Sequence, residues 1–259
     1  MAKLRAGAII AVFLLVTLIL IPWQWLANLF HFPWRKTFPQ AYHKFLCRLF
    51  GFRLRIIGAP LKNQGVLLLA NHTSWIDILI FSAAAPISFV AKAEVARWPL
   101  FGTLARLQRS VFVERMRRAQ TGEARDEIRE RLLQGDALVL FPEGTSGDGN
   151  FVLPFKSALM GAAEATLEGG RRVPVQPVAA AYVRCHGMPM GRETRAFYAW
   201  FGDMGMVPHL WEALQAGPLD VTIQFFAPLS VEQMNRKQLA LAAHGIVREG
   251  VALALAGCV

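Results

Sequence analysis

Cysteine is scarce in this sequence, and the few cysteines are scattered. The three are Cys47, Cys185 and Cys258, and no two of them form a C-x-x-C pair. An odd, dispersed set excludes a disulfide framework and lacks the paired thiolates of most structural zinc sites. The sequence therefore indicates a reducing compartment, and at 259 residues the chain is long enough to bury a full core without such cross-links.

Acidic residues are also few. The chain has 18 Asp and Glu against 28 Lys and Arg, and charged residues make up 18% of it, whereas hydrophobic residues make up 54%. Soluble domains usually contain about 45–50% apolar residues. A basic and unusually apolar protein suits an anionic membrane surface. Nucleic acid would also attract this charge, but no stretch interleaves aromatic and basic residues as nucleic-acid sites do. We therefore expect a phospholipid membrane as partner and no nucleic acid.

Charge is absent altogether from Ala6 to Trp34. Residues 9–21 are almost all aliphatic, and crossing a bilayer takes about 20 apolar residues, but Pro22 is expected to break or kink the helix. Lys and Arg flank both ends, so the positive-inside rule gives a single span no orientation. We expect residues 1–36 to form a membrane anchor, a helical hairpin or re-entrant pair. A secretory signal is the alternative, but no small-x-small cleavage site follows.

Residues 37–51 are predicted to form an amphipathic helix at the membrane interface, because apolar side chains recur on one side of it. That stripe consists of Tyr42, Phe45, Leu46, Leu49 and Phe50. His43, Lys44 and Arg48 are expected on the opposite, interfacial side. The next residues, 52–57, alternate apolar and basic side chains, which is typical of an edge strand.

The remaining chain, residues 52–259, alternates short apolar runs with helical patterns. Strands are predicted near 66–70, 87–91, 111–113, 137–141, 173–182 and 219–227. Helices are predicted near 76–85, 99–108, 121–134, 156–168, 207–216 and 231–255. Such alternation predicts a single α/β domain with a mostly parallel sheet.

A histidine and an aspartate, His72 and Asp77, follow the first of these apolar strands within the segment Asn71–Asp77. On a regular helix, residues five apart point about 140° away from each other, so the two meet only if a loop or turn carries one of them. A histidine at a strand end can take a proton near neutral pH, and a nearby carboxylate can orient it. The alternative interpretation is a surface turn in which Asp77 opens the next helix.

Three further segments follow in a fixed order. They are Lys92-Ala93-Glu94 after one strand, Phe141-Pro142-Glu143-Gly144-Thr145-Ser146 after another, and the Pro-interrupted strand of residues 173–178. Together with the H-x4-D pair, these segments resemble the lysophosphatidate (1-acyl-glycerol-3-phosphate) acyltransferase family, over roughly residues 66–182. The resemblance implies a glycerolipid-acyltransferase-like domain at 52–259, with a mostly parallel mixed sheet flanked by helices, plus N-terminal membrane helices.

The resemblance also implies roles for individual residues. His72 would act as general base on an acceptor hydroxyl, and Asp77 would orient it. The substrate-binding residues would be Asn71, Lys92, Glu143, Gly144, Thr145 and Ser146, with backbone N–H groups of the Phe141–Thr145 turn near the reacting oxygen. Glu143 would either bind acceptor hydroxyls or brace the turn. The donor would be acyl carrier protein or CoA thioester, with no cofactor and no metal, at the cytoplasmic face of the inner membrane.

Two departures from the family pattern concern the acceptor. The family commonly has Arg after F-P-E-G-T, where this chain has Ser146, and Ala158 replaces a Gly. Arginine suits a phosphate because its planar fork makes two parallel charge-assisted bonds. A lyso-ornithine lipid, whose head group is an amino acid without phosphate, is therefore an acceptor to set beside lysophosphatidate.

Two other classes of function stay open at this point. One is a catalytically inactive, membrane-anchored lipid-binding protein, which would not need His72 and Asp77. The other is a thioesterase or lipase, but Ser74 lies in no G-x-S-x-G elbow.

Overall fold

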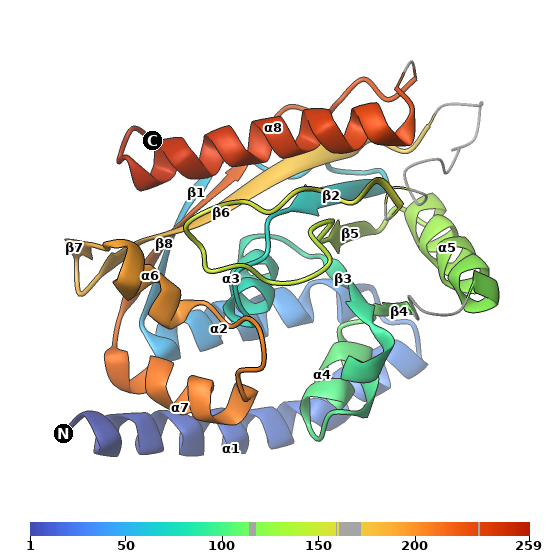
Figure 1. Ribbon diagram of the computed structural model, residues 1–259. Coiled ribbons are helices and arrows are strands. Elements are labelled where there is room, and N and C mark those ends of the chain that lie inside the picture. Colours follow the sequence, from blue (N-terminus) through green and yellow to red (C-terminus); the bar gives the residue numbers. More distant parts are fainter. Residues whose placement is uncertain (114–117, 159, 161–171, 233) are drawn as a thin grey trace.

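In the computed structural model, the described residues are 1–113, 118–158, 160, 172–232 and 234–259 (Figure 1). A mixed sheet forms the middle layer. Its strands are β1 (Phe52–Ile57), β2 (Val66–Ala70), β3 (Ser88–Lys92), β4 (Val111–Val113), β5 (Ala137–Leu140), β6 (Val175–Cys185), β7 (Met188–Pro189) and β8 (Leu219–Phe225). The order is β1-β8-β6-β2-β5-β3-β4, with β7 beside β6.

The strands from β6 to β4 along this order are mutually parallel, whereas β8 runs antiparallel to β6 and β1 is parallel to β8. The predicted mostly parallel α/β sheet is therefore confirmed, with β1 as an edge strand. Parallel strands end at the same edge of a sheet, so this order brings the segments after β2, β3 and β5 together.

The helices are α1 (Ala2–Leu29), α2 (Phe38–Phe50), α3 (Ile76–Ala84), α4 (Phe101–Leu107), α5 (Arg118–Leu133), α6 (Arg192–Tyr198), α7 (Met206–Ala216) and α8 (Arg236–Leu255), with 3-10 turns η1 (Pro33–Lys36) and η2 (Ala93–Arg97). The predicted helix at 156–168 lies largely outside the described residues. Helix α6 was not predicted, because its seven residues are too short to show a periodic pattern.

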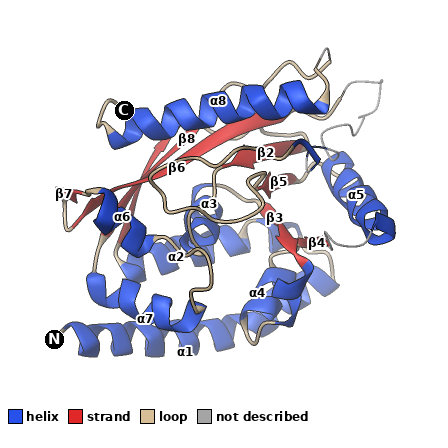
Figure 2. Ribbon diagram, viewed as in Figure 1, coloured by secondary structure: helices blue, strands red, loops and turns tan. Residues whose placement is uncertain are grey.

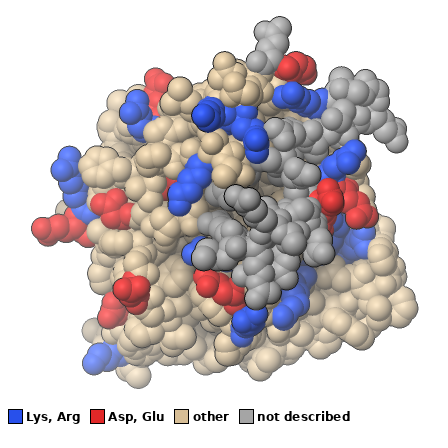
Figure 3. All heavy atoms as spheres, turned by 45° about the vertical axis from the view of Figure 1, so that its right-hand side comes forward, with Lys and Arg blue, Asp and Glu red and all other residues tan. Residues whose placement is uncertain are grey.

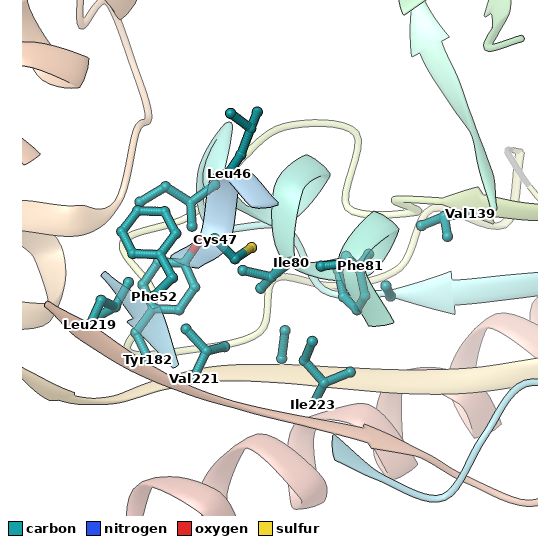
Figure 4. Close-up of a cluster of buried hydrophobic side chains, with 14 of the residues drawn as sticks. Leu46, Cys47, Phe52, Ile80, Phe81, Val139, Tyr182, Leu219, Val221 and Ile223 are labelled. Carbon is teal, nitrogen blue, oxygen red and sulfur yellow. The ribbon is translucent and has the colours of Figure 1, made fainter. Parts of the chain in front are cut away.

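Helices cover both faces of the sheet (Figure 2). On one face α8 packs against β6, and Ala243, Val247 and Ala179 belong to one buried apolar cluster. On the other face α2 and α3 bury residues such as Leu46 and Ile80 against β6 and β8 (Figure 4). Helices α1, α4 and α7 lie outside α2 and α3 (Figure 1).

In the described part of the chain, two helices are long and apolar enough to cross a membrane, α1 and α8. For α8 the reason is its place in the core, where its inner side packs on the sheet and Asn235 closes its first turn with a capping box. For α1 only 17% of the apolar window is buried.

Helix α1 continues through Pro22, so the expected break at this proline is wrong. Contacts on both sides of the proline hold the helix in place. Before it, Thr17 bonds the hydroxyl of Tyr42 at 2.6 Å, and after it, Gln24 donates to the carbonyl of Leu107 at 3.0 Å. Tertiary packing thus outweighs the missing N–H and the local preference.

Helix α1 contacts the rest of the described chain near both of its ends. Near its start Arg5 donates to the carbonyl of Leu214 at the end of α7, and near its end Asn28 donates to the carbonyl of Leu107. Helix α2 runs back along it, with Phe50 packing against Phe13.

The predicted amphipathic helix at 37–51 is present as α2, but its buried side is rotated from the one we expected. His43 is buried and not interfacial, and its Nδ1 lies 2.7 Å from the carbonyl oxygen of Pro39. Burial lowers the pKa of His43 to about 4, so this side chain is neutral. Phe45, predicted on the apolar stripe, is exposed. The sequence did not indicate that α1 would cover this side of α2.

A buried carboxylate joins the N-terminal helices to the sheet. Asp136, just before β5, lies 2.7 Å from Lys36 of η1 and 2.8 Å from Arg109, and it also pairs with Arg131. Burial alone would raise the pKa of Asp136, but hydrogen bonds from Lys36 and Arg131 and the nearby arginines outweigh it and lower the pKa. Figure 3 shows most charged side chains above the lower rim of the molecule, the level at which Figure 1 places α1.

Candidate active site

The candidate site begins where β2 ends. The residue after the strand, Asn71, continues the pairing with β6 by its side chain: its amide donates to the carbonyl of Ala180 and accepts from the N–H of Ala180, both at 2.9 Å. Asn71, predicted to bind substrate, is thus buried with both ends of its amide bonded to backbone. It ends the strand and turns the chain toward His72.

The next residues bring His72 and Asp77 together, as the sequence predicts. Asp77 lies in the first turn of α3, and its Oδ2 is 2.8 Å from Nδ1 of His72. The same oxygen accepts the backbone N–H of Thr73 at 2.6 Å and of Ser74 at 3.0 Å. The loop therefore closes on the carboxylate, which is 1% exposed, while the His72 side chain is 20% exposed.

The Phe141–Ser146 segment after β5 holds the backbone of His72 from the other side. Glu143 Oε1 accepts the N–H of His72 at 2.8 Å, and the N–H of Gly147 donates to the His72 carbonyl at 2.9 Å. The ring of Phe141 stacks on the imidazole, with centroids 4.1 Å apart. The hydrogen bonds thus hold the backbone of His72, and the stacking orients its ring.

Glu143 is a bracing residue in this geometry. Its second oxygen accepts the N–H of Leu153 at 3.1 Å, so both oxygens bond backbone, and the side chain is 1% exposed. Burial raises the pKa of Glu143 to about 8, against the lowering effect of these two N–H groups. Of the two roles that the sequence left open, bracing the turn is the one these contacts favour.

The other predicted substrate-binding residues differ in their surroundings. Gly144 has a φ of +75° and donates its N–H to the carbonyl of Phe141, so this N–H stays within the turn. Thr145 is exposed. Ser146 donates its hydroxyl to the carbonyl of Trp200, in the segment after α6. Lys92 lies at the same sheet edge, half exposed, with Nζ 3.7 Å from Glu94.

An apolar cavity of about 160 Å³ reaches the loop that carries the pair. Trp75, from the His72–Asp77 loop, lines it together with residues from α1, α2, α3, β3, α4 and α7. The indole N–H of Trp75 donates to Nδ1 of His209 at 2.8 Å, and Nε2 of His209 lies 3.0 Å from the carbonyl oxygen of Phe197. These bonds attach the cavity wall to α7.

Sequence analysis missed two residues at this site. Tyr182 of β6 donates its hydroxyl to Oδ1 of Asp77 at 2.7 Å. His209 accepts the indole N–H of Trp75 at 2.8 Å. The only signal for Tyr182 was a polar hydroxyl at the end of an apolar strand, and His209 had none, because both partners lie more than a hundred residues away.

Among the described residues, no group of three His, Cys, Asp or Glu side chains is placed to hold a metal ion. Ser74, the residue that a serine-hydrolase mechanism would need, is fully buried. The imidazole of His72, by contrast, is partly accessible at this sheet edge.

Comparison with known proteins shows what the whole chain is similar to. A family model described as Acyltransferase matches residues 53–181. The chain is 46% identical to a lyso-ornithine lipid O-acyltransferase of Brucella abortus (strain 2308), over 98% of this chain and 96% of the relative. It is 33% identical to a 1-acyl-sn-glycerol-3-phosphate acyltransferase of Neisseria gonorrhoeae, over 64% of this chain and 61% of the relative. The crystal structure of the 1-acyl-sn-glycerophosphate (LPA) acyltransferase PlsC from Thermotoga maritima has the same fold, with a TM-score of 0.68 and 22% identity over 97% of each chain.

Proposed function

The chain belongs to the acyltransferase family, and on that premise we propose that it transfers a fatty acyl group from a thioester to the hydroxyl of a lyso-ornithine lipid. The acyl-transfer chemistry rests on the buried His72–Asp77 pair. The choice of acceptor rests on Ser146, whose hydroxyl is already bonded to the carbonyl of Trp200.

The reaction we assign to the pair is a direct transfer. A carboxylate only accepts hydrogen bonds, so Nδ1 of His72 carries the hydrogen that bonds Asp77, and Nε2 keeps its lone pair. Nε2 takes the proton of the acceptor hydroxyl while the oxygen attacks the thioester carbonyl carbon. The tetrahedral intermediate then collapses, the C–S bond breaks, and the departing thiolate takes the proton from His72. Asp77 stabilises the imidazolium in between.

The acceptor head group is assigned from charge. Where relatives of the phosphate-binding type have an arginine, Ser146 offers no charge, and its one hydroxyl hydrogen is donated to Trp200. Lys92 and Glu94, 3.7 Å apart at the same edge, provide one positive and one negative group. An ornithine head group carries both an ammonium and a carboxylate, so this pair suits it better than a phosphate.

We assign the fatty acyl chain of the donor to the apolar cavity. Fatty chains have no charge to recognise, so shape and apolar lining select them. The cavity is lined by Trp75, in the loop between His72 and Asp77, and by residues of α2 and α4. Acyl carrier protein and CoA both present a fatty acyl group as the thioester that the mechanism requires, and either is compatible with this cavity.

We assign α1 to the inner-membrane surface, with the catalytic domain on the cytoplasmic face, where acyl thioesters are made. Large apolar side chains on the side of α1 away from the domain are exposed: Val12, Leu14, Leu15, Leu18, Ile19, Trp23, Trp25 and Leu29. Soluble monomers rarely expose an apolar patch of this kind to water, whereas a bilayer buries it.

An acceptor competition tests the proposal. Purified protein in detergent receives acyl carrier protein that bears a labelled fatty acyl thioester. Lysophosphatidate and lyso-ornithine lipid are added at equal concentrations, and the products are separated. Diacyl ornithine lipid should be the main product, and thiol should be released only when an acceptor is present. Phosphatidate as the main product would overturn the acceptor assignment, and thiol release without acceptor would indicate a thioesterase.

A substitution sharpens this test. Ser146→Arg places a phosphate-binding fork where the family commonly has one, so the ratio of phosphatidate to ornithine lipid should rise by about tenfold or more. Gln134→Arg adds the same charge at the exposed end of α5 and should leave the ratio unchanged. Equal shifts in both variants would mean that net charge, and not the position of Ser146, sets the preference.

A further inference from the structure

Tyr182 is the one side chain outside the H-x4-D loop that bonds the catalytic carboxylate directly among the described residues. It lies near the end of β6, four residues beyond Val178, which pairs with Ala70 at the end of β2. Its ring is 2% exposed and packs in the apolar cluster near Phe52 and Leu219 (Figure 4). The sheet register therefore places the hydroxyl under α3, where Asp77 lies.

The two oxygens of Asp77 have very different surroundings. Oδ2 accepts three hydrogen bonds, from the N–H groups of Thr73 and Ser74 and from His72. Oδ1 accepts the hydroxyl of Tyr182 at 2.7 Å and no other hydrogen bond in the described part of the chain. Without this hydroxyl, a buried carboxylate oxygen would lose its donor, which carries a desolvation penalty.

The direction of this bond is determined by its chemistry. A carboxylate accepts, so the phenol donates. Burial, together with the charge of Asp77 and the bond to it, raises the pKa of Tyr182 well above its usual value. The phenol therefore keeps its proton at any pH at which the enzyme works, and it acts by hydrogen bonding and not by exchanging a proton.

We propose that Tyr182 is a positioning residue of the reaction: its hydroxyl holds Asp77 Oδ1 so that Oδ2 stays aligned with Nδ1 of His72 and Nε2 faces the acceptor. The hydrogen bonds then run from Tyr182 of β6 to Asp77 of α3, and from Asp77 to His72 in the loop after β2. This inference rests on the proposed roles of His72 and Asp77.

The hydroxyl also influences the charge that the imidazole experiences. A hydrogen bond to Oδ1 draws negative charge away from Oδ2; removing it leaves more charge facing His72 and favours the protonated imidazole. The other ionisable groups near the pair are Glu143, which bonds the His72 N–H, and Arg195, which donates to the backbone carbonyl of Tyr182. Neither of them bonds Asp77, so a change at Tyr182 is transmitted through the carboxylate.

The test is Tyr182→Phe, which removes one oxygen and keeps the ring in its apolar surroundings. Because substitution of outer hydrogen-bond partners typically lowers activity by about 10- to 100-fold, we expect kcat to fall in that range with KM nearly unchanged. The acid limb of kcat/KM should move to higher pH. Tyr198→Phe is the matched control: that buried hydroxyl bonds Cys185 and Gly217, away from the pair, and its loss should change neither kcat nor the pH profile.

A double-mutant cycle separates positioning from general damage. In the Asp77→Asn background, Tyr182→Phe should change kcat less than about twofold, because the carboxylate through which it acts is gone. Thermal unfolding in the same detergent checks that each variant is folded.

Three outcomes overturn the inference. The first is a kcat of Tyr182→Phe within twofold of the parent, and the second is a rise in KM with kcat unchanged. The third is the same fractional loss of kcat in the presence and in the absence of the Asp77 carboxylate. A failure of the proposed mechanism looks different, because His72→Ala would then keep its activity. Loss of activity in His72→Ala together with an unimpaired Tyr182→Phe would refute the role of Tyr182 alone.

Discussion

Glu143 provides the sharpest quantitative prediction, because its carboxyl is 1% exposed and still bonds two backbone N–H groups. Burial raises its pKa from 4.5 to about 8. A raised pKa means that the folded protein favours the protonated form. Its contribution to stability is therefore fully present below pH 4.5 and is lost as the pH rises through about 8.

The magnitude follows from the two pKa values. At about 1.4 kcal/mol per pKa unit, the gap between 4.5 and about 8 corresponds to about 5 kcal/mol in total, of which about 4 kcal/mol falls between about pH 5 and pH 9. Glu143→Gln keeps the shape of the side chain but cannot ionise. At pH 5 the amide and the protonated carboxyl each offer one acceptor oxygen, so the two proteins should have similar free energies of unfolding.

The assay is denaturant unfolding of the parent and of Glu143→Gln in the same detergent between pH 5 and pH 9. The free energy of unfolding of the variant relative to the parent should rise by about 4 kcal/mol over this range. Glu249→Gln, at an exposed position of α8, removes the same charge and should leave the pH dependence unchanged. A difference between Glu143→Gln and the parent that does not vary with pH would refute the reasoning, and would mean that the two N–H groups keep Glu143 ionised.

Three further predictions concern catalysis and stability. His72→Ala should lower kcat by about a hundredfold or more, whereas Ser74→Ala should retain turnover because its hydroxyl is fully buried; the reverse result in a thiol-release assay would indicate an acyl-serine mechanism. Asp136→Asn should lower the free energy of unfolding by about 3–5 kcal/mol, because the partly buried Arg109 and Arg131 and the exposed Lys36 lose their shared counter-charge, and an unchanged Tm would contradict this. Trp75→Phe should cost about 1–3 kcal/mol by leaving Nδ1 of His209 without its donor; equal stability in denaturant would show that this bond contributes nothing.

Sequence reasoning located the reactive residues because of a simple topological rule. His72, Lys92 and Glu143 each follow an apolar run, and runs of this kind form parallel strands whose ends share one edge of the sheet. The rule places residues at an edge but says nothing of side-chain direction. It therefore left open whether Glu143 binds substrate or braces the turn, and the two backbone N–H groups bonded to it favour the brace.

Predictions about single helices were weaker. Pro22 was expected to interrupt α1, and His43 was expected at an interface. Both expectations considered each helix alone. In the folded chain, α1 continues through its proline with contacts from α2 and from Leu107 on either side of it, and α1 covers the side of α2 that carries His43. Neither contact has a local signature, because the partners come from distant parts of the chain.

The sequence by itself determined the α/β class, the family and the pair His72 and Asp77, because strand periodicity and motif spacing are local properties of the chain. Only the tertiary structure decided that Tyr182 bonds Asp77, that Ser146 bonds Trp200, and that an apolar cavity reaches the loop between His72 and Asp77. These features depend on which strands pair, in which register, and on how helices close over the sheet. Such contacts can join residues more than a hundred positions apart, as for Tyr182 and Asp77, and the physical reason for them is the packing of the whole core rather than any one segment.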